Sequence, residues 1–155
     1  MNPYRELSNF IITNIYKQLQ KKGPLTLFDL KHMVAGALWE EKQKKKSKID
    51  RNFALHRYSV YRKRWISLMD YCLGAQESAG FLRKQPCEVP PTATYFEDSA
   101  ILYSITDAGL TQLKNSSPDS MFGAAQQVIH SRAEQMLKCR VIQTRKHYDL
   151  ITKKR

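Results

Sequence analysis

The sequence predicts a mainly α-helical α+β fold with one small β-hairpin, and three observations predict it. Apolar residues recur every three or four positions through residues 7–19 and again through residues 27–38, which is the spacing of amphipathic helices. A proline-rich segment, residues 86–99, lies between two short extended segments. The chain has 155 residues, 42% of them hydrophobic, which is enough for one domain with an appended helix.

Two helices are predicted at the N-terminus. Pro3 suits the first turn of a helix whose stripe repeats every four residues. The stripe consists of Leu7, Ile11, Ile15 and Leu19. Gly23 and Pro24 end this helix, because glycine tolerates a left-handed backbone and proline cannot continue the hydrogen-bond ladder. Thr26 is then predicted to cap a second helix that extends to about residue 39.

A third helical region is predicted between residues 53 and 79, as one long helix or two short ones. Its N-terminal half is aromatic and basic, whereas its C-terminal half is apolar and nearly neutral. Trp65, Leu68 and Cys72 are expected to anchor it to the core. Residues 41–52 have no apolar stripe and are expected to form a loop or a frayed helix end.

Extended and helical segments alternate after Gly80. Residues 81–84 begin a strand, residues 86–99 are predicted to be a loop, and residues 101–105 form a second strand. Thr106 is expected to cap a helix whose core contacts are Leu110 and Leu113. A final helix is predicted from about Met121 toward Lys153.

The net charge of +12 is concentrated in two blocks. Residues 40–64 carry +7 and residues 132–155 carry +6, whereas residues 65–131 between them carry −4. Solubilising charge is normally spread more evenly, so this segregation is typical of a surface that binds a polyanion. Taken alone, a lysine-rich run is also typical of a solvated loop.

Several other function classes lack a motif. No apolar run is long enough to span a bilayer and no signal peptide is visible, so we expect a soluble cytoplasmic protein with no membrane partner. Cys72, Cys87 and Cys139 are odd in number and widely spaced, which favours reduced thiols. The histidines lie in no metal-ligand spacing, and no nucleophile elbow or phosphate loop occurs, so no metal, cofactor or catalytic residue is expected.

Two short motifs resemble those of winged-helix transcription regulators of the PadR and MarR families. The first is Gly80, Phe81, Leu82, Arg83 and Lys84, similar to the end of a recognition helix entering the wing. The second is the strand-to-helix junction Leu102, Tyr103, Ser104, Ile105, Thr106, Asp107, Ala108 and Gly109. The resemblance implies a fold that is mainly α with a small β-wing, a winged helix-turn-helix with long N- and C-terminal helices. It implies a DNA-binding domain over residues 1–115 and a basic, dimerising helix over residues 120–155.

In this family the helix before the wing enters the DNA major groove, which is wide enough for an α-helix. Carried over by position, the reading helix contains Tyr58 to Tyr71. Arginine pairs with guanine edges, while lysine and serine more often contact phosphates. The predicted DNA-binding residues are Lys42, Lys44, Lys45, Lys46, Lys48, Arg51, Arg57, Tyr58, Ser59, Tyr61, Arg62, Lys63 and Arg64. For Tyr58 and Tyr61, packing in the core is the alternative.

The chain departs from the family pattern in two places. Residues 41–51 form an insertion that separates the second and third helices by more than a tight turn. The predicted wing contains Glu88, Glu97 and Asp98 and no Lys or Arg between Gln85 and Ser99. We therefore expect DNA contact from the helix and the lysine run, with little from the wing tip.

The predicted function is sequence-specific binding of double-stranded DNA by a homodimer, as a transcriptional regulator in a bacterial, archaeal or mobile-element cytoplasm and associated with the nucleoid. The resemblance implies pairing through the terminal helix, whose predicted contacts are Val128, Met136, Leu137, Val141 and Leu150. Two alternatives stay open: an accessory protein of plasmid or phage replication or partition, and a protein-interaction module whose acidic wing docks a basic partner. An RNA partner also stays open, because backbone electrostatics alone do not distinguish RNA from DNA.

Overall fold

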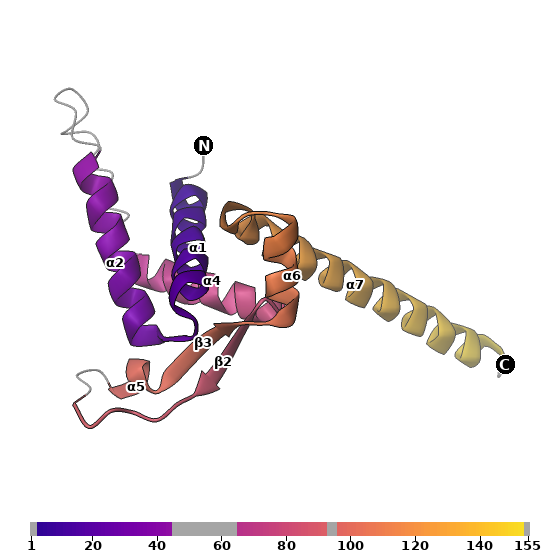
Figure 1. The fold of residues 1–155 in the computed structure, drawn as a ribbon. Helices are drawn as coiled ribbons and strands as arrows, with labels where there is room; N and C mark the ends of the chain where they lie inside the picture. Colours follow the sequence, from indigo (N-terminus) through magenta and orange to yellow (C-terminus); the bar gives the residue numbers. More distant parts are fainter. Residues whose placement is uncertain (1–2, 45–64, 93–95, 154–155) are drawn as a thin grey trace.

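The protein is mainly helical and carries one three-stranded antiparallel sheet, which confirms the predicted α+β class (Figure 1). The computed structural model describes the backbone of residues 3–44, 65–92 and 96–153, and the side chains of residues 5–41, 65–92 and 97–147. In chain order the elements are α1 (Pro3–Lys22), β1 (Leu25–Thr26), α2 (Leu27–Lys44), α4 (Trp65–Ser78), β2 (Leu82–Pro86), α5 (Phe96–Ser99), β3 (Ile101–Ile105), α6 (Asp107–Asn115), a 3-10 turn (Pro118–Ser120) and α7 (Met121–Lys153).

The first helix ends as its sequence predicts. Ile11, Ile15 and Leu19 are buried, and Gly23 has a φ of 78° with its N–H donating to the Leu19 carbonyl at 2.9 Å. This is the left-handed turn that glycine makes without steric cost. Thr26 caps α2 as predicted, because its hydroxyl accepts from the Asp29 N–H at 3.2 Å.

The sheet contains one strand that the sequence pattern does not indicate. Leu25 pairs with Tyr103 and Thr26 with Leu102, which places β3 between β1 and β2. Two residues are too few for the alternation that identifies a strand. Their pairing depends instead on a partner segment that is distant in the chain.

The core lies where α1, α2, α4 and the first turns of α7 meet. Met69, Cys72 and Leu73 of α4 are buried against it, and Trp65 and Leu68 pack on it while half-buried. The predicted anchoring by Trp65, Leu68 and Cys72 is therefore confirmed. Burial of apolar side chains in this cluster is the main favourable term that holds the helices together.

Two local expectations are wrong. The predicted loop between the strands contains a single helical turn, α5, which packs on α2. Leu110 is 45% exposed rather than a core contact, whereas Leu113 is buried as predicted. The reason is that α6 approaches the body of the protein along Gly109, so that Gly109 and Leu113 face it. Leu110 lies about 100° from Gly109 around the helix and is therefore exposed.

The last helix leaves the body of the protein. Met121, Phe122 and Ala125 are buried in the core cluster shared with α1, whereas every side chain over residues 129–147 is exposed. Figure 1 shows α7 projecting away from the other elements. Among the described residues, none of the helices combines the length and apolar character that crossing a bilayer requires. The division at residues 115–120 stays a prediction.

Candidate nucleic-acid interface

The junction between α4 and β2 is a helix C-cap of regular hydrogen-bond pattern. Gly80 has a φ of 83°, its N–H donates to the Glu77 carbonyl at 3.0 Å, and the Phe81 N–H donates to the Gln76 carbonyl at 3.0 Å. This pair of bonds is the Schellman motif, which satisfies the last carbonyls of a helix and turns the chain sharply. The end of α4 and the start of the hairpin are therefore fixed relative to each other.

The two motifs found in the sequence contact each other at this junction. The Thr106 N–H donates to the Phe81 carbonyl at 3.0 Å, and the Thr106 hydroxyl donates to the Gly80 carbonyl. The same hydroxyl accepts from the Gly109 N–H at 3.1 Å, which makes Thr106 the predicted cap of α6. One threonine therefore joins the C-terminus of α4, the strand β3 and the N-terminus of α6.

Gly109 is required by a close approach of α6 to the same turn. A Cβ atom at this position would lie 2.3 Å from the Phe81 carbonyl oxygen and 2.8 Å from the Ile105 side chain. The Phe81 carbonyl cannot move away freely, because it accepts the Thr106 N–H. The glycine that ends the second motif thus has a packing role that its sequence position alone does not reveal.

The hairpin that follows carries both signs of charge. Leu82 pairs with Ile105 and Pro86 with Ile101 along β2 and β3. Arg83 and Lys84 are exposed on β2, and Glu88 and Glu97 are exposed nearer the tip of the hairpin. Asp98 forms an ion pair with Lys31 of α2, with 3.0 Å between Oδ2 and Nζ. Part of the acidic charge of the hairpin is therefore neutralised within the chain.

Most of the predicted DNA-binding residues lie outside the described residues. Lys42 and Lys44 lie on the last turn of α2, for which the structure gives the backbone alone. The remaining predicted residues, namely Lys45, Lys46, Lys48, Arg51, Arg57, Tyr58, Ser59, Tyr61, Arg62, Lys63 and Arg64, fall within residues 45–64. The sequence of α4 itself contains no Lys or Arg, so a basic contact from this helical region has to come from residues before Trp65.

The second basic block lies on α7. The Arg132 guanidinium donates to the Ser78 carbonyl at the end of α4, where a cation is favoured by the helix dipole. Further basic side chains are exposed farther along, namely Lys138, Arg140, Arg145 and Lys146. Sequence reasoning missed the contact of Arg132 with the α4 terminus, because nothing local links the two positions.

The predicted dimerisation residues do not share one environment. Met136, Leu137 and Val141 are 62%, 61% and 54% exposed. Val128 is partly buried against the core of its own chain, and the side chain of Leu150 lies outside the described residues. Three of the five predicted dimerisation residues therefore have large apolar side chains that are exposed to solvent.

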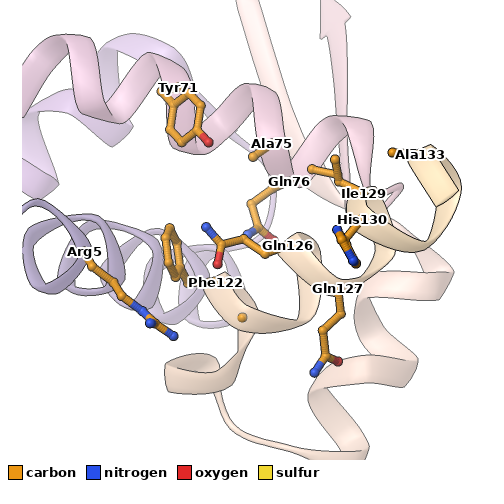
Figure 2. A pocket seen from close by; sticks show the side chains of 11 residues that line it. Arg5, Tyr71, Ala75, Gln76, Phe122, Gln126, Gln127, Ile129, His130 and Ala133 are labelled. Atoms are coloured by element: carbon orange, nitrogen blue, oxygen red, sulfur yellow. The ribbon is translucent and has the colours of Figure 1, made fainter. Parts of the chain in front are cut away.

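A groove of about 640 Å³ lies between α1, α4 and the base of α7. Figure 2 shows Tyr71 and Ala75 lining it from α4, and Ile129, His130 and Ala133 lining it from α7. Arg5 of α1 also lines it, and the buried Gln76 lies at its floor. The groove therefore adjoins the point where α7 leaves the body.

Burial raises the pKa of three titratable groups in the core. Burial raises the pKa of the Cys72 thiol to about 11 and that of Tyr103 to about 12, with smaller contributions to Tyr103 from the charges of Glu77 and Asp70. Burial also raises the pKa of Tyr16. All three groups are therefore protonated at neutral pH. Within the described parts of the chain, no three His, Cys, Asp or Glu side chains converge in a way that could hold a metal ion.

Comparison of the chain with protein-family models, with curated proteins and with solved structures gave no match.

Proposed function

We propose that this chain is a winged-helix protein that binds double-stranded DNA as a homodimer and regulates transcription. The observation that carries the proposal is the interlocked junction of Gly80, Phe81, Thr106 and Gly109. It fixes a helix end against the base of a two-stranded hairpin, which is the relation between a reading helix and its wing. The motifs that resemble those of winged-helix regulators are the segments that make these contacts.

The distribution of charge supports a nucleic-acid partner. Residues 40–64, which carry +7, directly precede α4. Basic side chains at the start of a helix that leads into a hairpin would meet the phosphates on either side of the major groove. Phosphate contacts give most of the affinity, while the arginines of this segment are candidates for base recognition.

The homodimer is supported by the exposed apolar side chains of α7. Met136, Leu137 and Val141 are each more than half exposed on a helix that projects from the body. Monomeric proteins seldom leave such a series uncovered, and their exposure often marks an association surface. A two-fold dimer would present two basic segments to two half-sites of one duplex.

A salt titration tests DNA binding directly. We expect fluorescence anisotropy with a labelled duplex to give an affinity that falls steeply with salt, by about 0.9 log units for each phosphate contact and each tenfold rise in salt. Absent or salt-independent binding would refute the proposal. Lys114→Ala is the matched control for substitutions in the basic blocks, because Lys114 is exposed on α6 and lies outside both blocks. It should leave the affinity unchanged.

A second measurement separates reading from backbone contact. At least one of Arg62→Ala and Arg64→Ala should reduce the preference for a selected sequence, while Lys44→Ala should weaken all duplexes alike. Equal effects of the three substitutions would contradict this division.

Footprinting then separates a regulator, which protects a promoter operator, from a replication or partition protein, which protects repeated sites near an origin.

A further inference from the structure

The side of α7 that packs on the body of the protein ends at Arg132. Met121, Ala125 and Val128 pack on the core and follow one another at spacings of four and three residues, so they share one side of the helix. Arg132 comes next at this spacing, and Cys139, two turns farther along the same side, is exposed. Among the described residues of this side, Arg132 makes the outermost hydrogen bond to another element.

Arg132 completes the end of α4. The two bonds of the Schellman motif reach the carbonyls of Gln76 and Glu77, and neither reaches the Ser78 carbonyl. The Arg132 guanidinium donates to that third carbonyl, and its Nη2 lies 3.9 Å from the position that a Cβ atom would take at Gly80. A cation is favoured here because the last turn of a helix carries a partial negative charge. α7 therefore supplies a donor that the turn itself does not provide.

The same turn is joined to the hairpin and to α6. The Thr106 hydroxyl donates to the Gly80 carbonyl, and the Thr106 N–H donates to the Phe81 carbonyl at 3.0 Å. Thr106 also caps α6 through the Gly109 N–H. Residues 78–81 therefore connect α7, through Arg132, to the elements that the proposed function assigns to DNA recognition.

Two polar contacts with α4 define the direction of α7. At the start of α7 the Gln76 amide nitrogen donates to the Met121 carbonyl at 3.0 Å. Arg132 bonds to Ser78 eleven residues later, which is about 16 Å along the helix at about 1.5 Å per residue. The apolar contacts between these points are non-directional, whereas a hydrogen bond requires a defined distance and angle. Two fixed points on one straight helix determine its direction.

The length of α7 beyond Arg132 amplifies any change of direction. Residues 133–153 correspond to about 32 Å of helix at about 1.5 Å per residue. Every described side chain of this part is exposed. A tilt of about 10° at Arg132 would move the far end of the helix by about 5–6 Å, which exceeds the rise of about 3.4 Å for one base pair of DNA.

We propose that Arg132 is a positioning residue that fixes the direction of α7 relative to the junction of α4 and β2, and thereby sets the spacing of the two DNA half-sites. In a two-fold dimer the distance between the reading helices has to match the separation of the half-sites. The direction of α7 enters this distance because α7 projects from the body that carries the reading helix. The consequence for DNA rests on the proposed function, whereas the positioning of α7 is a property of the single chain.

Distances within one chain test the positioning by pulsed electron paramagnetic resonance on the full-length protein. Spin labels at Lys114→Cys on α6 and Thr144→Cys on α7 occupy exposed positions, in a background of Cys87→Ser and Cys139→Ser. An excess of unlabelled chain restricts the signal to pairs within one chain. Arg132→Ala should broaden the distance distribution about twofold, because the second fixed point is lost. Arg132→Lys should restore most of the narrow distribution, because it keeps a cationic donor at the end of α4.

Arg140→Ala is the matched control for Arg132→Ala. It removes the same kind of side chain from an exposed position farther along α7, where the guanidinium bonds to no other described element. The Arg140→Ala distribution should equal that of the wild type. Arg132 is itself exposed, so circular dichroism of Arg132→Ala should show an unchanged fold. A distribution that Arg132→Ala leaves as narrow as the wild type would overturn the inference.

Duplexes with two selected half-sites at varied separations test the consequence for DNA. By fluorescence anisotropy the wild type should prefer one separation by about tenfold, and Arg132→Ala should reduce this preference to about threefold or less. The affinity for a single half-site and the dimer Kd should stay unchanged. A loss of affinity for the single half-site, or an equal loss at every separation, would show direct contact or general damage and would overturn the positioning role.

The inference and the proposed function fail in distinguishable ways. A chain that binds no duplex, or that never dimerises, would refute the proposed function and with it the role of Arg132 in half-site spacing. The distances within the chain would then still decide whether Arg132 fixes α7. A preferred half-site separation that Arg132→Ala leaves intact would support the proposed function and overturn the inference.

Discussion

The Tyr16 hydroxyl donates a 2.6 Å hydrogen bond to Oε1 of Gln76, joining α1 to α4 inside the core. The Gln76 amide nitrogen in turn donates to the Met121 carbonyl of α7 at 3.0 Å. Both side chains are at most 1% exposed. The groove, the helix that leads into the hairpin and the projecting helix therefore share one buried polar link, whose members satisfy one another.

Removal of either partner should destabilise the protein, because a buried polar group would lose its hydrogen bond. We expect Tyr16→Phe to lower the free energy of unfolding by about 1–3 kcal/mol and Gln76→Leu by at least as much, since the latter removes both hydrogen bonds of Gln76. The double variant should lose less than the sum of the two. Urea unfolding measures all three.

Tyr71→Phe is the matched control for Tyr16→Phe. It removes the same hydroxyl from an exposed tyrosine on α4, so the change should stay within about 0.5 kcal/mol. Equal losses from Tyr16→Phe and Tyr71→Phe, or strictly additive losses at positions 16 and 76, would show that the buried link contributes nothing.

Gly109→Ala should be among the most damaging single-methyl additions in this chain. The new Cβ would lie 2.3 Å from the Phe81 carbonyl oxygen, so α6 has to move away from the junction. We expect a loss of about 3 kcal/mol or more in thermal or urea unfolding, at the upper end of over-packing effects. Gly74→Ala is the comparison, because that helical glycine has open space around its Cβ position and should gain about 0.5–1 kcal/mol. Similar stabilities for the two variants would contradict the packing role of Gly109.

Sequence patterns predicted the parts of this fold that local chemistry determines. Gly23 ends α1, and Thr26 and Thr106 cap α2 and α6, because each of these features depends on residues within one helical turn. The four-residue spacing of Ile11, Ile15 and Leu19 identified the buried face of α1 for the same reason. These rules require no knowledge of the rest of the chain.

Features that depend on distant residues were not predicted. The β1 strand exists because Leu25 meets Tyr103, and Gln76 is buried because Tyr16 and Met121 supply its partners. Leu110 is exposed because Gly109 sets the rotation of α6 against Phe81. Of the candidate DNA-binding residues, Lys42 and Lys44 alone have a described backbone, so their role stays a prediction.

Cys72 should make the protein less stable at high pH. Burial raises the pKa of its thiol from 9.0 to about 11, so the unfolded chain loses this proton at lower pH than the folded chain. The stabilisation is fully present below about pH 9 and is lost as pH rises through 11, by about 3 kcal/mol in total. Urea unfolding of the wild type and Cys72→Ala across pH 8–11 should show a steeper fall for the wild type. Parallel pH profiles for the two proteins would contradict a raised pKa of the Cys72 thiol.

The Lys31–Asp98 ion pair should hold the hairpin to α2 only weakly. Both side chains are about a quarter exposed and their charged atoms are 3.0 Å apart, so solvent screens the attraction. A double-mutant cycle with Lys31→Met and Asp98→Asn should give a coupling below about 1 kcal/mol that shrinks as salt rises. A larger coupling that is independent of salt would show that the pair is desolvated. Because little DNA contact is expected from the wing tip, we expect Asp98→Asn to leave the affinity for duplex DNA at low salt unchanged, although it leaves the charge of Lys31 uncompensated. Tighter binding would show that the charge at this site acts on the phosphates.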